Sequence, residues 1–175
     1  FNFYSGYPNK SLKSWIFDPS YNINDNRILN FIKKLKKNKF KIGIHPSFDS
    51  WNNEEKLINE INVLSKCIGK KVTNCRQHWL RFSWFTTWKN QENSKIKLDT
   101  TLMFNDRPGF RQSSAIFYNP WNSELGKKYN LQSLPTILMD SHLYDYNYFS
   151  EKDINNEIKR WTNEVKKVHG SVAVL

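Results

Sequence analysis

Short β-branched runs alternate with longer amphipathic segments along this chain, and this alternation constrains the fold more than any other feature. Apolar residues recur at helical spacing over residues 25–38, 53–66 and 151–168. Short apolar runs that predict strands occupy residues 42–44, 72–75, 96–98, 134–139 and 172–175. Strands that are separated by helices pair in parallel, because the helix returns the chain across the sheet. The sequence therefore predicts an α/β fold in which these five strands are parallel neighbours in one sheet.

Local signals mark where the predicted helices begin and end. Asp25 can cap the first helix and Asn38 can end it in a left-handed conformation. Glu54 and Glu55 suit the first turn of the second helix, and Gly69 suits its end. A further helix is expected after Thr86. The segment from Ser5 to Pro19 shows no sustained period and is expected to be a loop that crosses the mouth of the fold.

Polar side chains follow three of the predicted strands. His45 comes directly after residues 42–44, Arg76 and His78 come after residues 72–75, and Asp99 comes after residues 96–98. Because the carboxyl ends of parallel strands meet at one edge, we expect these side chains to project into one cleft. A structural, hydrogen-bonded histidine is the alternative for His45 and for His78 when each is taken alone.

Three motifs in order carry a resemblance to a known family. They are Ile42-Gly43-Ile44-His45-Pro46-Ser47, Arg76-Gln77-His78-Trp79-Leu80-Arg81-Phe82, and Asp99-Thr100-Thr101-Leu102-Met103-Phe104-Asn105-Asp106 followed by Gly109-Phe110-Arg111. The first resembles the histidine motif, and the second the arginine motif, of a bacterial branch of the polysaccharide deacetylases (carbohydrate esterase family four and its relatives). The resemblance covers most of the chain between Asp25 and Asp140. It implies an irregular (β/α) barrel of about seven parallel strands.

The resemblance also implies a metal-dependent hydrolase that removes acetyl groups from a surface polysaccharide or a glycan precursor. In that family an Asp–His–His site holds a divalent ion, zinc or a similar metal, and an arginine orients an aspartate base. His45 matches the first metal histidine, and Asp49 stands where the family has the second. A carboxylate is an acceptable ligand there, and His78 is a rival. Arg76 matches the arginine, and we assign a catalytic role to Arg76 and Asp99.

Further polar and aromatic residues are candidates for contact with a sugar. We assign substrate binding to Trp79, Arg81, Asp106 and Arg111. Arg81 could instead join a salt bridge, and Asp106 and Arg111 could brace a long loop. Flat rings stack on pyranose faces, but core packing is the alternative for each tryptophan. The tryptophans in or beside the loops are Trp51, Trp79, Trp84, Trp88 and Trp121.

The two ends of the chain both have the character of interior sequence. Phe1-Asn2-Phe3-Tyr4 alternates like a strand, and the chain stops in the apolar run Val172–Leu175. We expect residues 1–175 to be a single deacetylase-like domain that lacks the family's paired-aspartate motif, on the first strand, and its late histidine, on the last. Such a fragment would bind metal weakly or not at all. A non-catalytic relative that binds glycan is the alternative, since Asp49 replaces a histidine.

Charge and composition limit the other functions. The formal net charge is +11, from 27 Lys and Arg against 16 Asp and Glu, which suits either anionic partners or a solvated lysine surface. Nucleic-acid binding is a third hypothesis, but no recognition motif accompanies the charge, so we expect no nucleic-acid partner. No apolar run approaches the length of a membrane span.

Cys67 and Cys75 form no metal or redox motif and suit a reducing, cytoplasmic compartment. The oligomeric state is left open.

Overall fold

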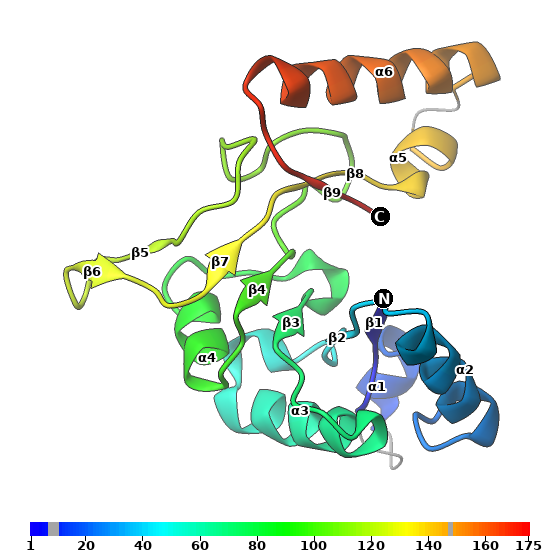
Figure 1. The fold of residues 1–175 in the computed structure, drawn as a ribbon, viewed down its shortest axis with the longest axis vertical. Coiled ribbons are helices and arrows are strands. Elements are labelled where there is room, and N and C mark those ends of the chain that lie inside the picture. Colours follow the sequence, from blue (N-terminus) through cyan, green and yellow to red (C-terminus); the bar gives the residue numbers. More distant parts are fainter. Residues whose placement is uncertain (7–10, 147–148) are drawn as a thin grey trace.

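Five short parallel strands form the main sheet of this chain. The computed structural model describes residues 1–6, 11–146 and 149–175. The sheet order is β1-β2-β3-β4-β7, and every neighbouring pair is parallel (Figure 1). The strands span Asn2–Phe3, Gly43–Ile44, Asn74–Cys75, Leu98–Asp99 and Gln132–Ser133, respectively. The prediction of an α/β fold with parallel strands is confirmed.

Helices α2 (Asn26–Lys37) and α3 (Glu54–Ile68) pack on this sheet as the apolar pattern predicts. Asp25 caps α2 through the Arg27 N–H, and Gly69 ends α3 with a φ of 70°. The helix faces and the strand between them bury one apolar cluster, which includes Ile32, Leu35, Ile44, Leu57 and Leu64. A third helix, α4 (Thr87–Asn93), follows Thr86 as expected and joins the sheet through Trp88. This core holds the carboxyl ends of the strands in place.

The segment from Ser5 to Pro19 contains a helix that the sequence did not predict. Helix α1 spans Leu12–Phe17, and the Ser11 hydroxyl accepts a hydrogen bond from the Ser14 N–H. Residues 7–10 lie outside the described part of the chain. The helix is short and buries no complete side chain, with Trp15 70% exposed. Its apolar residues have no periodic buried face, which is why the pattern indicated a loop.

The last two predicted strands form a separate sheet, which corrects the expectation of one continuous sheet. Strand β8 (Thr136–Leu138) pairs in parallel with β9 (Ala173–Val174). Pro135 lies between β7 and β8 and has no N–H for a ladder hydrogen bond, so the main sheet ends there. In the described part of the chain, neither sheet closes, and the predicted barrel is therefore not seen.

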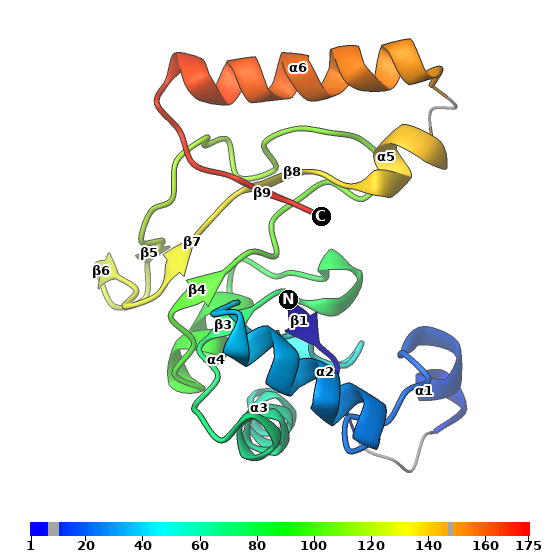
Figure 2. The same cartoon turned by 45° about the vertical axis from the view of Figure 1, so that its right-hand side comes forward.

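The chain around β8 and β9 builds a second layer above the main sheet. It includes the antiparallel hairpin of β5 (Trp121–Asn122) and β6 (Lys127–Lys128) and the helices α5 (Asp140–Tyr144) and α6 (Glu151–Lys167). Figure 2 shows α6 crossing the end of the molecule that lies opposite α3. Ile137, Leu143, Ile154 and Val165 belong to its apolar cluster. No helix of the described residues is long and apolar enough to cross a membrane.

Candidate functional site

The backbone ladder delivers the predicted site residues to one edge of the main sheet. His45 follows β2, and its N–H donates to the Phe3 carbonyl at 2.8 Å. Arg76 follows β3 and donates its N–H to the Ile44 carbonyl at 3.0 Å. Thr100 follows β4 and donates to the Cys75 carbonyl at 2.9 Å. These bonds hold the first residue after each strand in register, so His45 and Arg76 are neighbours as predicted.

Two histidines form a pair at this edge. His45 Nε2 lies 2.7 Å from His78 Nδ1, and the ring planes are nearly perpendicular. The outer nitrogen of each ring bonds a backbone carbonyl: His45 Nδ1 donates to Arg76 O at 2.8 Å, and His78 Nε2 donates to Phe17 O at 2.6 Å. Both rings are thereby oriented with one nitrogen facing the other.

The hydrogen bonds to the two carbonyls determine which ring nitrogens of His45 and His78 carry a proton. A neutral imidazole has one N–H, and each ring uses that N–H on a carbonyl oxygen, which can only accept. The lone pairs of His45 Nε2 and His78 Nδ1 would then face one another. Burial first, and then the charge of His78, lowers the pKa of His45 to about 4, and burial lowers the pKa of His78. The burial disfavours an extra proton on either ring, which leaves the two facing nitrogens as electron-pair donors.

A buried carboxylate holds the loop that follows His45. Glu60, on α3, is 1% exposed and accepts hydrogen bonds from the Ser47 N–H, the Ser47 hydroxyl and the Ser50 hydroxyl. Burial raises the pKa of Glu60, while the bonds from Ser47 and Ser50 lower it. Three donors from residues 47–50 converge on one side chain, which anchors this loop to α3.

Asp49, the alternative metal ligand, is engaged away from the histidine pair. Its Oδ1 accepts from Lys13 Nζ at 2.8 Å and from Arg81 at 3.4 Å. The hydrogen bond from Lys13 lowers the pKa of Asp49. Among the residues that the structure describes, no group of three His, Cys, Asp or Glu side chains could hold a metal ion. Two of the three predicted ligands, His45 and His78, thus come together, and Asp49 joins a salt bridge.

Arg76 and Asp99, the two predicted catalytic residues, have different surroundings. Arg76 is 8% exposed, its Nε donates to Thr100, and burial lowers its pKa. Asp99 is fully buried and accepts from Trp88 Nε1 at 3.2 Å, from Gln91 Nε2 at 2.9 Å and from Thr101. Burial raises the pKa of Asp99. The expectation that Asp99 opens into the same cleft as His45 is therefore not met.

An exposed aromatic group borders the histidine pair. Trp79 is 55% exposed, has a φ of 56°, and donates from Nε1 to Phe17 O at 3.1 Å. The same carbonyl accepts from His78, so Trp79 is tied to the pair through one atom. Phe17 and Phe48 stack with ring centroids 4.4 Å apart. The guanidinium of Arg81 lies 4.0 Å from the centre of the Phe48 ring.

The remaining predicted substrate residues do not contact the histidine pair. Asp106 is exposed and pairs with the adjacent Arg107. Arg111 is half-buried, donates to the Leu80 and Met103 carbonyls, and has a pKa that burial lowers. It therefore braces the loop after β4, which was the stated alternative. Trp88 is buried in the core, whereas Trp84 and Trp121 are exposed.

Three contributors to this site were missed from the sequence. Glu60 stands on the apolar stripe of α3, three residues after Leu57 and four before Leu64, and that position could have identified it as buried. Asp18 accepts from the Phe48 N–H at 2.7 Å and is 9% exposed. The Phe17 carbonyl, which orients His78, lies 61 residues away in sequence and carries no local signal.

Comparison with known proteins identifies a solved structure that shares the fold of this chain. No family model and no curated protein matches the sequence. A Mycobacterium smegmatis protein, described as a "putative polysaccharide deacetylase", superposes with a TM-score of 0.63 at 18% identity over 87% of this chain. A Bordetella bronchiseptica protein with the same description and an assigned part in O-antigen biosynthesis has a TM-score of 0.48 at 16% identity and covers 69% of the chain. The chain spans about half the length of both structures, 54% and 48% respectively.

Proposed function

We propose that this chain is part of a metal-dependent hydrolase that removes acetyl groups from a polysaccharide or a glycan precursor. The observation that carries the proposal is the pair of inward-facing nitrogens on His45 and His78, 2.7 Å apart at the carboxyl edge of a parallel sheet. The motif resemblance and the shared fold of the Mycobacterium smegmatis structure support it. Neither gives the sugar that carries the acetyl group.

The donor set of the pair fits a divalent transition ion such as zinc. Imidazole nitrogens are common zinc ligands, and the carbonyl bonds from the other nitrogens select the tautomers that leave the facing lone pairs free. A metal ion bound there would polarise the acetyl carbonyl and lower the pKa of water. His45 and His78 would be two of the ligands, and we propose that a third protein ligand lies outside the described residues. We assign it to the family's paired-aspartate motif.

Other residues of the chain would position the pair and the sugar. Glu60 holds the backbone that follows His45, and the Arg76 carbonyl orients the His45 ring. Trp79 offers an exposed ring beside His78 on which an apolar sugar face can stack. The catalytic assignment of Arg76 and Asp99 stays a prediction. The burial of Asp99 and its bond to Thr101 favour a role in bracing the loop after β4.

A glycan-binding protein without catalysis is the second candidate. The ion pairs of Asp49 with Lys13 and Arg81 favour it, since the position that matches a metal ligand is used for a salt bridge. Both candidates use the exposed ring of Trp79. They differ in whether His45 and His78 hold a metal ion.

An acetate-release assay tests the proposal. The protein with its natural flanking sequence, loaded with Zn²⁺, is incubated with N-acetylated chitooligosaccharide and with O-acetylated xylan. Acetate release that His45→Ala and His78→Ala both abolish supports the hydrolase. Binding of either glycan without acetate release, in protein that elemental analysis finds free of metal, would establish the binding protein instead.

A further inference from the structure

Paired lysines precede three neighbouring strands of the main sheet. Lys39 and Lys41 come before β2, Lys70 and Lys71 before β3, and Lys95 and Lys97 before β4; all six are exposed. The helices α2, α3 and α4 each end beside a residue with positive φ, at Lys39 (61°), Gly69 (70°) and Lys95 (65°). The same turn is thus used three times, and it places all six lysines at the amino edge of the sheet, opposite the histidine pair.

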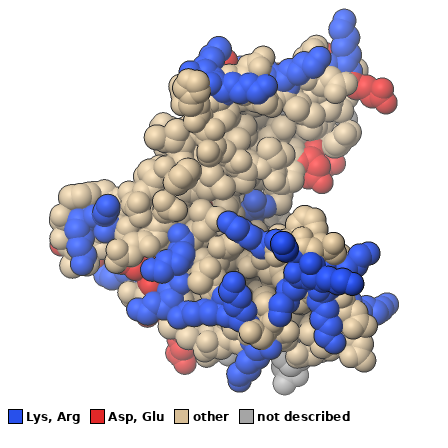
Figure 3. Space-filling model, in the orientation of Figure 1, with Lys and Arg blue, Asp and Glu red and all other residues tan. Residues whose placement is uncertain are grey.

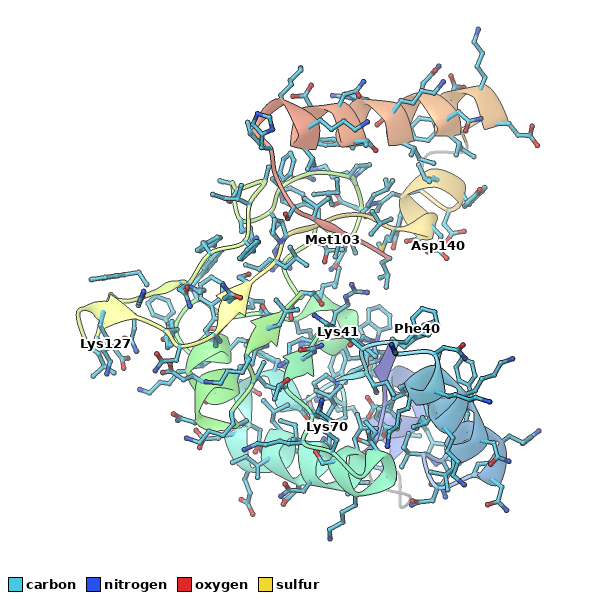
Figure 4. The ribbon with its side chains drawn as sticks, viewed as in Figure 1. Phe40, Lys41, Lys70, Met103, Lys127 and Asp140 are labelled. Atoms are coloured by element: carbon cyan, nitrogen blue, oxygen red, sulfur yellow. The ribbon has the colours of Figure 1, made fainter. Side chains whose placement is uncertain are left out.

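A groove of about 440 Å³ lies between the first two lysine pairs. Its cationic lining is Lys36, Lys39, Lys41, Lys70 and Lys71. Its apolar lining is Phe40, Ile42, Ile68 and Val72, and it contains no Asp, Glu or Arg. Figure 4 labels Phe40, Lys41 and Lys70 in this part of the molecule. In Figure 3, Lys and Arg crowd the half of the surface that carries α2 and α3, and few acidic side chains are visible there.

Helix ends explain only part of this charge. Lysine near a helix C-terminus interacts favourably with the helix dipole, but the effect is confined to the last turn. Lys36 meets this description, because it lies in the last turn of α2 and its Nζ donates to the Ile68 carbonyl. Lys41 lies three residues beyond Asn38, the C-terminal cap of α2. The ion pairs found among described residues involve none of the groove lysines.

We propose that this groove binds an anionic polysaccharide, a chain with repeated carboxylate or phosphate groups, through Lys39, Lys41, Lys70 and Lys71. The inference rests on the proposed function, because it names a charged class of glycan for a glycan-directed protein. The cations match the acidic groups, and the exposed ring of Phe40 in the groove lining suits the apolar faces of sugar rings.

The lining favours a glycan over nucleic acid and over a membrane. Arginine is the residue of choice for nucleic-acid recognition, because its planar guanidinium matches base edges, and the groove residues include none. A flat lipid surface would reach the exposed lysines and Phe40 but not Ile68 and Val72, the buried part of the lining. An anionic sugar chain is narrow enough to lie in the groove between the lysines.

The position of the groove gives it a role for the histidine site. Lys41 and His45 lie at opposite ends of β2, four residues apart, which is about 13 Å in an extended strand. A polymer that is held at the amino edge keeps its other segments close to the carboxyl edge. The groove would therefore raise the effective concentration of acetylated segments at the site.

The test compares two variants with the same change in net charge. The groove variant carries Lys39→Gln, Lys41→Gln, Lys70→Gln and Lys71→Gln. The control carries Lys127→Gln, Lys128→Gln, Lys152→Gln and Lys159→Gln, four exposed lysines on β6 and α6. Binding of polygalacturonate is measured by calorimetry at two salt concentrations. Neutral pullulan, a single-stranded RNA and phosphatidylserine vesicles are measured beside it.

We expect the groove variant to bind polygalacturonate at least about tenfold more weakly than wild type, and the control to stay within about threefold. An equal loss in both variants would overturn the proposal, because it would show a general charge effect. So would groove-dependent binding of RNA or vesicles without binding of polygalacturonate. Polygalacturonate binding that persists in a protein without acetate release would support the groove and refute the hydrolase.

Discussion

The imidazole rings of His45 and His78 meet nitrogen to nitrogen at 2.7 Å, and each ring is held from behind by a backbone carbonyl. Arg76 O orients the first ring and Phe17 O orients the second. Because each N–H is already used, the inner nitrogens are both available as electron-pair donors. Zn–N bonds are about 2.0–2.1 Å long, so the two rings would move apart to share one ion. This pair is the centre of the candidate site.

Removal of either histidine is expected to remove a bound divalent ion. His45→Ala and His78→Ala should each weaken Zn²⁺ binding by more than about 100-fold. This loss exceeds the one expected for a residue that only hydrogen-bonds to a metal ligand. Asp49→Ala should leave the affinity close to wild type, since Asp49 bonds Lys13 and Arg81. Calorimetric titration of the protein with its natural flanks measures the affinity.

An exposed histidine provides the control for that experiment. His169 follows α6 and is exposed, so His169→Ala should bind Zn²⁺ as wild type does. If Asp49→Ala lost as much affinity as His78→Ala, the carboxylate and not the second imidazole would be the partner of His45.

Glu60 is expected to stabilise the loop that carries the site. Glu60→Ala leaves the Ser47 N–H and two hydroxyls without their acceptor, which should cost about 2–4 kcal/mol of unfolding free energy. Urea denaturation measures the loss. Glu55, on the same helix, is exposed, and Glu55→Ala should leave the midpoint nearly unchanged. Equal midpoints for the two variants would contradict the anchoring role.

Asp99 is expected to make stability fall as pH rises. Burial raises the folded-state pKa of Asp99, so its contribution is complete below the ordinary carboxyl pKa and is lost as pH rises through the folded value. The free energy of unfolding of wild type minus that of Asp99→Asn should therefore decrease from about pH 4 upward. Denaturation at a series of pH values gives this difference. Asp106→Asn, at an exposed carboxylate, is the control, and an Asp99 difference that rose with pH would refute the assignment.

Trp79 is expected to contribute to sugar binding without supporting the core. It is 55% exposed and lies beside His78, so Trp79→Ala should weaken binding of N-acetylated chitooligosaccharide by about tenfold, an effect of about 1.4 kcal/mol. Trp121, on the β5–β6 hairpin, is 65% exposed and serves as the matched control. Titration followed by intrinsic fluorescence measures the affinity of both variants for the oligosaccharide. Comparable losses in the two variants would indicate unspecific contact with exposed rings.

The helices and the strand ends were predicted from local sequence signals. These signals were sufficient where a single residue determines where a helix or a strand ends. Asp25 begins α2 and Gly69 ends α3 as expected, because capping depends on neighbours within four residues. His45 and Arg76 lie side by side because each directly follows a strand of the same parallel sheet. The separation of β8 from the main sheet was missed, although Pro135 stands at the break.

The sequence by itself determined an α/β chain whose parallel strands each end in a polar residue. Only the tertiary structure decided that His45 meets His78 and not Asp49. The two candidates lie 33 and four residues from His45, and the choice depends on Phe17 O, Lys13 and Arg81, which α1 and the loop after β3 bring in. Burial raises the pKa of Asp99, and this too depends on tertiary structure, because the desolvation comes from the helix packed over the side chain and not from its neighbours in sequence.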